Sequence, residues 1–194
     1  YWFTSVSILP GQRSKNEKDT LFNDAMTAVR KGEVDGIIHV VAAGVHSKYV
    51  GNVKFPYDFS RTAQYALTSD ETKKYLFAEI EVLRGVAKHV AEADNSKKLW
   101  MITAINKQDI WFEKRDAILE HYNSGLFQKE VTAMESSRGK NFSHEYVELS
   151  LAIENYFDAS GAVRHRTSAG YDLRQQMDSI FSFVDQMFPP SFLA

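Results

Sequence analysis

The chain contains no cysteine, which excludes disulfide frameworks and thiolate chemistry of any kind. It also lacks an apolar run of membrane-spanning length and a recognisable signal peptide. Its formal net charge of −2 provides no global basic field of the kind that attracts nucleic acid. These absences fit a reducing compartment, so we expect a cytoplasmic protein with no membrane span and no nucleic-acid partner.

What the chain does contain is an ordinary globular composition, with 44% hydrophobic and 25% charged residues among 194. This length suits one sizeable domain, and we expect a single domain over residues 1–194. Residues 1–9 are aromatic and β-branched and begin as if already inside a strand, without an initiator methionine. We therefore expect that an N-terminal part of the domain is missing ahead of Tyr1.

Strand-like and helix-like patterns alternate along the chain. Short apolar or alternating runs predict strands at 1–9, 37–43, 99–105 and 144–152. Apolar residues at helical spacing predict helices from about Thr20 to Gly32, from Thr68 to about 93, at 114–121, at 127–134 and from Leu173 onwards. Polar segments at 13–19, 44–67, 136–140 and 155–172 predict loops. This alternation favours an α/β fold of three layers, with a mostly parallel sheet flanked by helices.

The most informative stretch is the apolar run Leu99 to Ile105, which ends abruptly on Asn106-Lys107-Gln108-Asp109. Such a run is typical of a strand buried on both faces. Ligands of open α/β sheets bind outside the carboxyl ends of the strands, where this tetrapeptide is expected to lie. The Asp109 carboxylate can accept both the ring N–H and the exocyclic amine of guanine, and adenine lacks that ring N–H. Asn106 can contact the other edge of the base, and the Lys107 stem can cover its face.

Here the chain resembles the P-loop GTPases, whose fourth motif is Asn-Lys-x-Asp after a buried strand. The resemblance implies a P-loop GTPase-like fold in which Asn106, Lys107 and Asp109 select the guanine of GTP or GDP. It also implies that Ser150, Leu151 and Ala152, which partly match the family's fifth motif, brace the base through their backbone.

The family's third motif, often Asp-Thr-Pro-Gly-Gln, is partly matched by Ile-Leu-Pro-Gly-Gln at residues 8–12. The resemblance implies that the Gly11 amide meets the γ-phosphate and that Gln12 orients the attacking water as the catalytic side chain. Ile8 stands where the family has the aspartate that holds Mg²⁺, and it offers no metal ligand. We assign no metal-binding residue, and the residues alone are also compatible with a plain strand-to-loop turn.

The glycine-rich phosphate loop of the family, Gly-x-x-x-x-Gly-Lys-Ser/Thr, occurs nowhere in the chain. In the family this loop precedes the third motif, which again places the missing part ahead of Tyr1. Relative to small GTPases, residues 44–67 form an insertion whose aromatic residues predict either a surface for a protein partner or packing onto the domain body.

Three hypotheses follow. The first is a guanine-nucleotide-binding domain that hydrolyses GTP as a molecular switch and needs Mg²⁺ for that step. The second is a catalytically inactive GTPase-like scaffold for protein interaction, which the isoleucine at position 8 and the aromatic insertion favour. The third is an α/β domain of another kind that has the Asn-Lys-Gln-Asp turn by coincidence.

Overall fold

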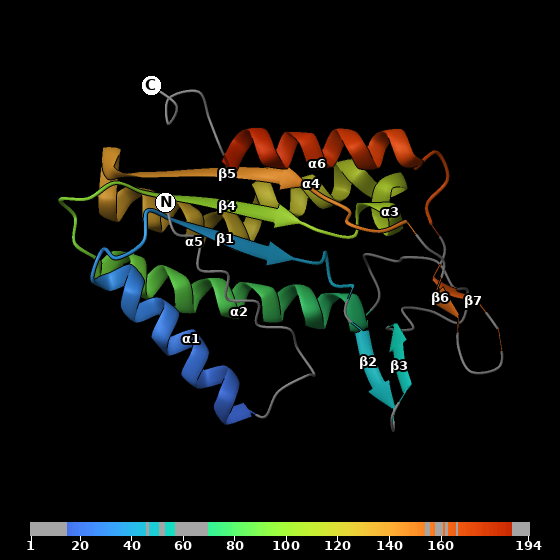
Figure 1. Ribbon diagram of the computed structural model, residues 1–194, viewed down its shortest axis with the longest axis horizontal. Helices are drawn as coiled ribbons and strands as arrows, with labels where there is room; N and C mark the ends of the chain where they lie inside the picture. Colours follow the sequence, from blue (N-terminus) through green and yellow to red (C-terminus); the bar gives the residue numbers. More distant parts are fainter. Residues whose placement is uncertain are drawn as a thin grey trace.

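The computed structural model of the chain describes residues 15–45, 47–50, 53–56, 70–153, 156–157, 161, 163–165 and 167–187 (Figure 1). Its helices are α1 (Lys15–Arg30), α2 (Asp70–Glu92), α3 (Gln108–Trp111), α4 (Arg115–Asn123), α5 (Gly125–Arg138) and α6 (Leu173–Met187), with two 3₁₀ turns, η1 (Phe112–Lys114) and η2 (Gly139–Asn141). Its strands are β1 (Gly36–Val41), β2 (Ser47–Val50), β3 (Val53–Pro56), β4 (Leu99–Ile105), β5 (Phe142–Glu148), β6 (Tyr156–Phe157) and β7 (Val163–His165).

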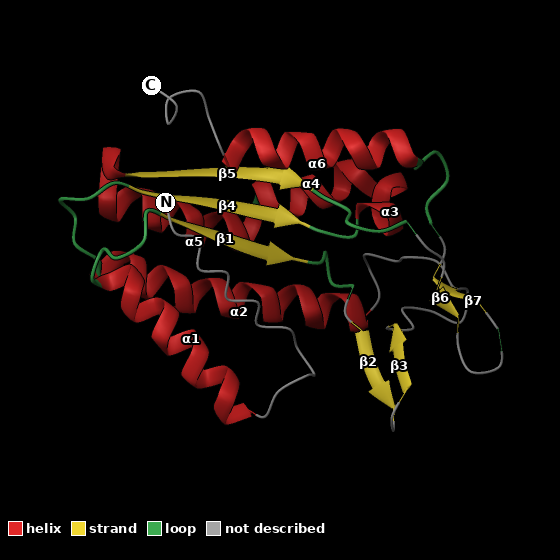
Figure 2. Ribbon diagram, in the orientation of Figure 1, coloured by secondary structure: helices red, strands yellow, loops and turns green. Residues whose placement is uncertain are grey.

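The central feature is a sheet of three parallel strands in the order β1-β4-β5. Strand β4 lies in the middle and pairs with β1 on one side and with β5 on the other. Helices cover both faces of this sheet (Figure 2). The α/β class and the helix-flanked parallel sheet predicted from the sequence are therefore confirmed.

Strand β4 separates two apolar cores because its successive side chains point to opposite faces. Leu99, Met101 and Ile105 contribute to the larger core, which is shared with α1, α2, α4 and α5. Ile102 and Ala104 contribute to a smaller core beneath α6. The predicted bounds of this strand, 99–105, are confirmed, because a strand buried on both faces carries its signal in its own sequence.

Strand β1 differs from the strand predicted at 37–43 in its bounds, and one of its faces is accessible. It ends at Val41 rather than at residue 43, and the side chains of Ile38 and Val40 are 38% and 57% exposed. Among the described strands β1 pairs only with β4, and α6 contacts β4 and β5. The face of β1 that lies in register with Ile102 and Ala104 is therefore left accessible.

Helix α6 places only part of its apolar residues on the sheet. Ile180, Phe183 and Met187 pack against the smaller core. Phe181, however, is 58% exposed. Leu173, Met177 and Val184 are also exposed, and together with Phe181 they form an accessible ridge along the helix.

Several predicted loops contain regular structure. The segment 13–19 was expected to be a loop, but α1 already begins at Lys15, and Gly32 (φ 63°) follows its end as predicted. Within 44–67 the described residues form the antiparallel pair β2–β3. Helix α5 continues to Arg138, so the loop expected at 136–140 is reduced to one 3₁₀ turn.

The loop expected at 155–172 also contains a short antiparallel pair, β6–β7. The strand predicted at 1–9 lies outside the described residues. In the part of the chain that the structure describes, none of the helices combines the length and the apolar character that crossing a membrane requires.

Candidate functional site

Three loops meet at one edge of the sheet, because parallel strands all end on the same side (Figure 1). Backbone hydrogen bonds tie these loops together. The N–H of Asn106 donates to the carbonyl of Val41 at 2.8 Å, and the N–H of Gln108 donates to the carbonyl of Leu149 at 3.1 Å. The turn after β4 is therefore fixed from both neighbouring strands.

The turn itself is tight and internally bonded. The Asn106 side-chain oxygen accepts the N–H of Lys107 at 2.7 Å, and Lys107 adopts the left-handed conformation with φ 63°. The indole N–H of the fully buried Trp111 donates to the carbonyl of Asn106 at 2.8 Å. Trp111 belongs to the aromatic pair that follows the motif, and it anchors the turn to the larger core.

Lys107 links the turn to the loop after β1. Its ammonium group donates to the carbonyl of Val45 at 2.7 Å, across 62 positions of sequence. That loop is strained at Ala43, whose φ of 49° is unfavourable for a residue with a Cβ, whereas Gly44 adopts its φ of 74° without strain. A Cβ on Gly44 would lie 2.9 Å from the carbonyl oxygen of Thr72, so only glycine fits there.

A buried carboxylate holds this strained loop in place. One oxygen of Glu79, on α2, accepts the N–H groups of Ala42 at 3.0 Å and Gly44 at 3.2 Å. The other oxygen accepts the hydroxyl proton of the buried Tyr122 at 2.6 Å. Glu79 is buried, unlike Glu81 on the same helix. A carboxylate that accepts several hydrogen bonds can be retained in a core.

Asp109 lies at the centre of the edge and is only 3% exposed. The hydroxyl oxygen of Ser150 lies 2.7 Å from its Oδ1 and 2.8 Å from the carbonyl oxygen of Ala152. Both are acceptors, and the carboxylate is the stronger one. This contact joins the end of β4 to the end of β5.

The loop before α6 closes over the same turn. The N–H of Ser168 donates to the carbonyl of Asp109 at 2.6 Å, and its hydroxyl donates to the carbonyl of Ile110 at 2.6 Å. Ser168 was not predicted as a site residue. A serine within a polar loop carries no local signal for such a contact.

The structure thus brings together most of the residues that the sequence singled out. Asp109 contacts Ser150, which also lies within hydrogen-bond distance of the Ala152 carbonyl, and Asn106 and Lys107 belong to the same turn as Asp109. Leu151 is in the same loop, and its side chain is largely exposed. Gly11, Gln12 and Ile8 lie outside the described residues, so the structure does not place them relative to this edge.

A metal site does not accompany these residues in the described part of the chain. No group of three or more His, Asp or Glu side chains there is arranged to hold a metal ion. The polar side chains at the sheet edge are one buried carboxylate, one ammonium and one side-chain amide.

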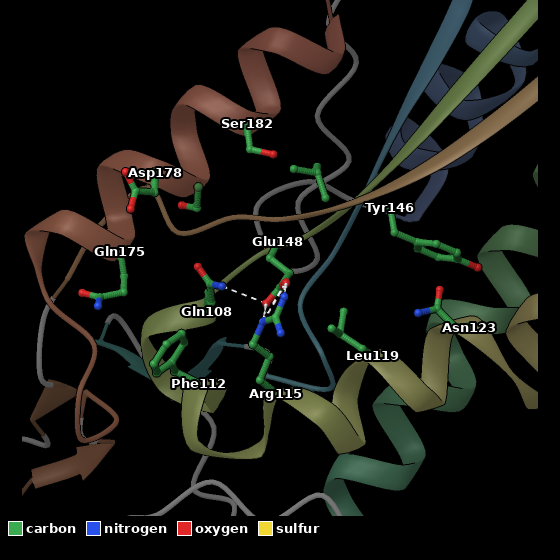
Figure 3. A pocket seen from close by; sticks show the side chains of 12 residues that line it. Gln108, Phe112, Arg115, Leu119, Asn123, Tyr146, Glu148, Gln175, Asp178 and Ser182 are labelled. Atoms are coloured by element: carbon green, nitrogen blue, oxygen red, sulfur yellow. Dashed lines mark hydrogen bonds and ion pairs between the residues drawn. The ribbon is translucent and has the colours of Figure 1, made fainter.

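Gln108 points away from the edge, into a separate cavity of about 420 Å³ between α6 and the α3–α4 segment (Figure 3). Its side-chain N–H donates to Glu148 at 2.8 Å, and Glu148 also receives the Arg115 guanidinium at 2.7 and 2.9 Å. Neither Lys107 nor Asp109 lines this cavity.

Comparison of the chain with protein-family models, with curated proteins and with solved structures gave no match in any of the three.

Proposed function

We propose that the chain binds guanine nucleotides at the carboxyl edge of its sheet and works as a GTP-dependent switch. The observation that carries this proposal is the 2.7 Å contact between the Ser150 hydroxyl and the Asp109 carboxylate. It joins two segments 41 residues apart and holds a buried carboxylate where parallel strands present ligands.

The chemistry of the edge suits a guanine ring. A carboxylate can accept the ring N–H and the exocyclic amine of guanine together. Adenine has an acceptor nitrogen in place of that ring N–H, and an ionised carboxylate has no donor for it. The Lys107 ammonium is anchored on Val45, so its aliphatic stem bridges two loops and offers an apolar surface to a flat ring. The left-handed turn at Lys107 fixes this geometry.

Hydrolysis enters the proposal through the family resemblance. The resemblance implies that Gly11 contacts the γ-phosphate, that Gln12 orients the attacking water, and that Mg²⁺ neutralises the developing charge. The resemblance assigns no residue of this chain to that ion, because isoleucine occupies the usual aspartate position.

The experiment measures how Asp109→Asn changes the affinity of the chain for two nucleotides, GDP and xanthosine diphosphate (XDP). An amide presents one donor and one acceptor, which mismatches guanine and matches xanthine, whose exocyclic group is a carbonyl. We expect affinity for GDP to fall about a hundredfold, the equivalent of two hydrogen bonds to a charged acceptor, and affinity for XDP to rise. Isothermal titration calorimetry measures both.

The matched control is Asp116→Asn, which removes an exposed carboxylate from the first turn of α4. It should leave both affinities unchanged. The proposal is wrong if the parent chain binds neither GDP nor GTP, with or without Mg²⁺. It is equally wrong if Asp109→Asn loses GDP without gaining XDP while remaining folded.

A second function, a GTPase-like scaffold without catalysis, is favoured by a different observation. The exposed ridge of α6 carries four large apolar side chains, which are Leu173, Met177, Phe181 and Val184. Exposed apolar patches often mark surfaces for protein partners. In this hypothesis the insertion at 44–67 adds to the partner surface. Nucleotide binding without turnover would favour this second function.

A further inference from the structure

The cavity beside Gln108 is built from three elements that converge on one space (Figure 3). Gln108, Phe112 and Arg115 come from the segment α3–η1–α4, Glu148 from the end of β5, and Gln175 and Asp178 from α6. Its volume of about 420 Å³ falls in the range of pockets that hold small organic ligands.

Several hydrogen-bond donors on its walls are used within the protein. Arg115 donates to both oxygens of Glu148, and the Gln108 amide N–H donates to the same carboxylate. The Ser179 hydroxyl donates to the carbonyl of Gln176 at 2.8 Å. Because an ionised carboxylate only accepts, the Gln108 nitrogen must face Glu148, which fixes its oxygen toward the cavity.

Two of the acceptors on the walls matter for the ligand that the cavity would hold. Gln108 is only 6% exposed, and its side-chain oxygen is buried without a hydrogen-bond partner in the described part of the protein. In Figure 3 this oxygen points toward α6, where the Asp178 carboxylate also faces the cavity. A buried acceptor without a partner carries a desolvation cost that a ligand's donor group can remove.

The charge of the cavity favours a cation. Its ionisable lining at neutral pH is Glu148, Asp178 and Arg115, which is two negative charges and one positive, a net charge of −1. The guanidinium of Arg115 is already neutralised by Glu148, so Asp178 supplies the uncompensated charge. Phe112 and Leu119 add apolar surface for the body of a ligand.

We propose that this cavity binds a small organic cation with planar N–H donors, of the amidinium or guanidinium class. One N–H group satisfies the Gln108 oxygen, and the positive charge lies near Asp178. Gln108 lines this cavity and Asp109 does not, so the cavity does not coincide with the guanine edge.

The test uses benzamidine as the cationic probe and benzoate as its anionic counterpart, on the whole chain. We expect benzamidine to bind with a dissociation constant of about 1 mM, which a fragment of this size reaches at modest efficiency. Titration followed by NMR should shift the side-chain amide resonances of Gln108. Asp178→Asn should weaken binding about five-fold, the scale of a partly exposed charge pair.

The control is Asp185→Asn, which removes an exposed carboxylate from the same helix outside the cavity. Its dissociation constant for benzamidine should equal that of the parent. The proposal is overturned if benzoate binds more tightly than benzamidine, or if benzamidine leaves the Gln108 amide unshifted. Equal affinities of the Asp178→Asn and Asp185→Asn variants would overturn it as well.

Discussion

Replacing Glu79 by alanine should remove the support beneath the candidate site. The variant would leave three donors without their acceptor, namely the N–H groups of Ala42 and Gly44 and the Tyr122 hydroxyl. Each unsatisfied buried donor costs about 1–3 kcal/mol, and water can enter the vacated space and recover part of that cost. We therefore expect the free energy of unfolding to fall by about 4 kcal/mol, a large share of the 5–15 kcal/mol typical of a domain.

Urea denaturation followed by tryptophan fluorescence measures this loss. With a slope of about 2 kcal/mol/M, the midpoint should move down by about 2 M. The control is Glu81→Ala, on the same helix, which breaks an exposed ion pair with Arg84 and should cost at most about 1 kcal/mol.

A second variant, Glu79→Leu, distinguishes the cost of donors left without an acceptor from the cost of a cavity. Leucine fills most of the space but accepts no hydrogen bond, so it should destabilise about as much as alanine. If leucine restored the parent stability, the cost would come from a cavity instead. If alanine at position 79 cost no more than alanine at position 81, the buried network would not support the loop.

Two further predictions concern stability. Burial lowers the pKa of His39 and of His144 to about 4, against an ordinary 6.5, so below pH 6.5 the unfolded chain binds more protons than the folded one. The free energy of unfolding should therefore fall between pH 6.5 and pH 4, by up to about 1.4 kcal/mol per pH unit for each histidine, and urea midpoints that stay constant over this range would contradict the assignment. On α6, Phe183→Ala should cost about 3 kcal/mol, whereas the neighbouring exposed Phe181→Ala should change thermal stability little; equal losses would contradict the observed orientation of the helix.

Much of the fold was predictable from local patterns. Strand β4 was predicted with its observed bounds, because burial on both faces leaves a continuous apolar run whatever its neighbours are. The buried stripe of α2, including Leu76, Ile80, Leu83 and Val90, follows helical spacing, which is also a local property. The residues of the turn after β4 were found for the same reason, since a motif at a strand end is readable in one segment.

The sequence by itself determined the central strand β4, the apolar stripe of α2 and which polar residues end β4. Tertiary structure decided what those residues contact. The Ser150–Asp109 hydrogen bond joins residues 41 positions apart. The hydrogen bonds of Glu79 join residues 35 to 43 positions apart. No local period encodes them, because hydrogen-bond partners are chosen by the packing of the sheet and its helices. The exposure of Val40 and of Phe181 was decided in the same way, since an apolar side chain is buried only where a neighbouring element covers it.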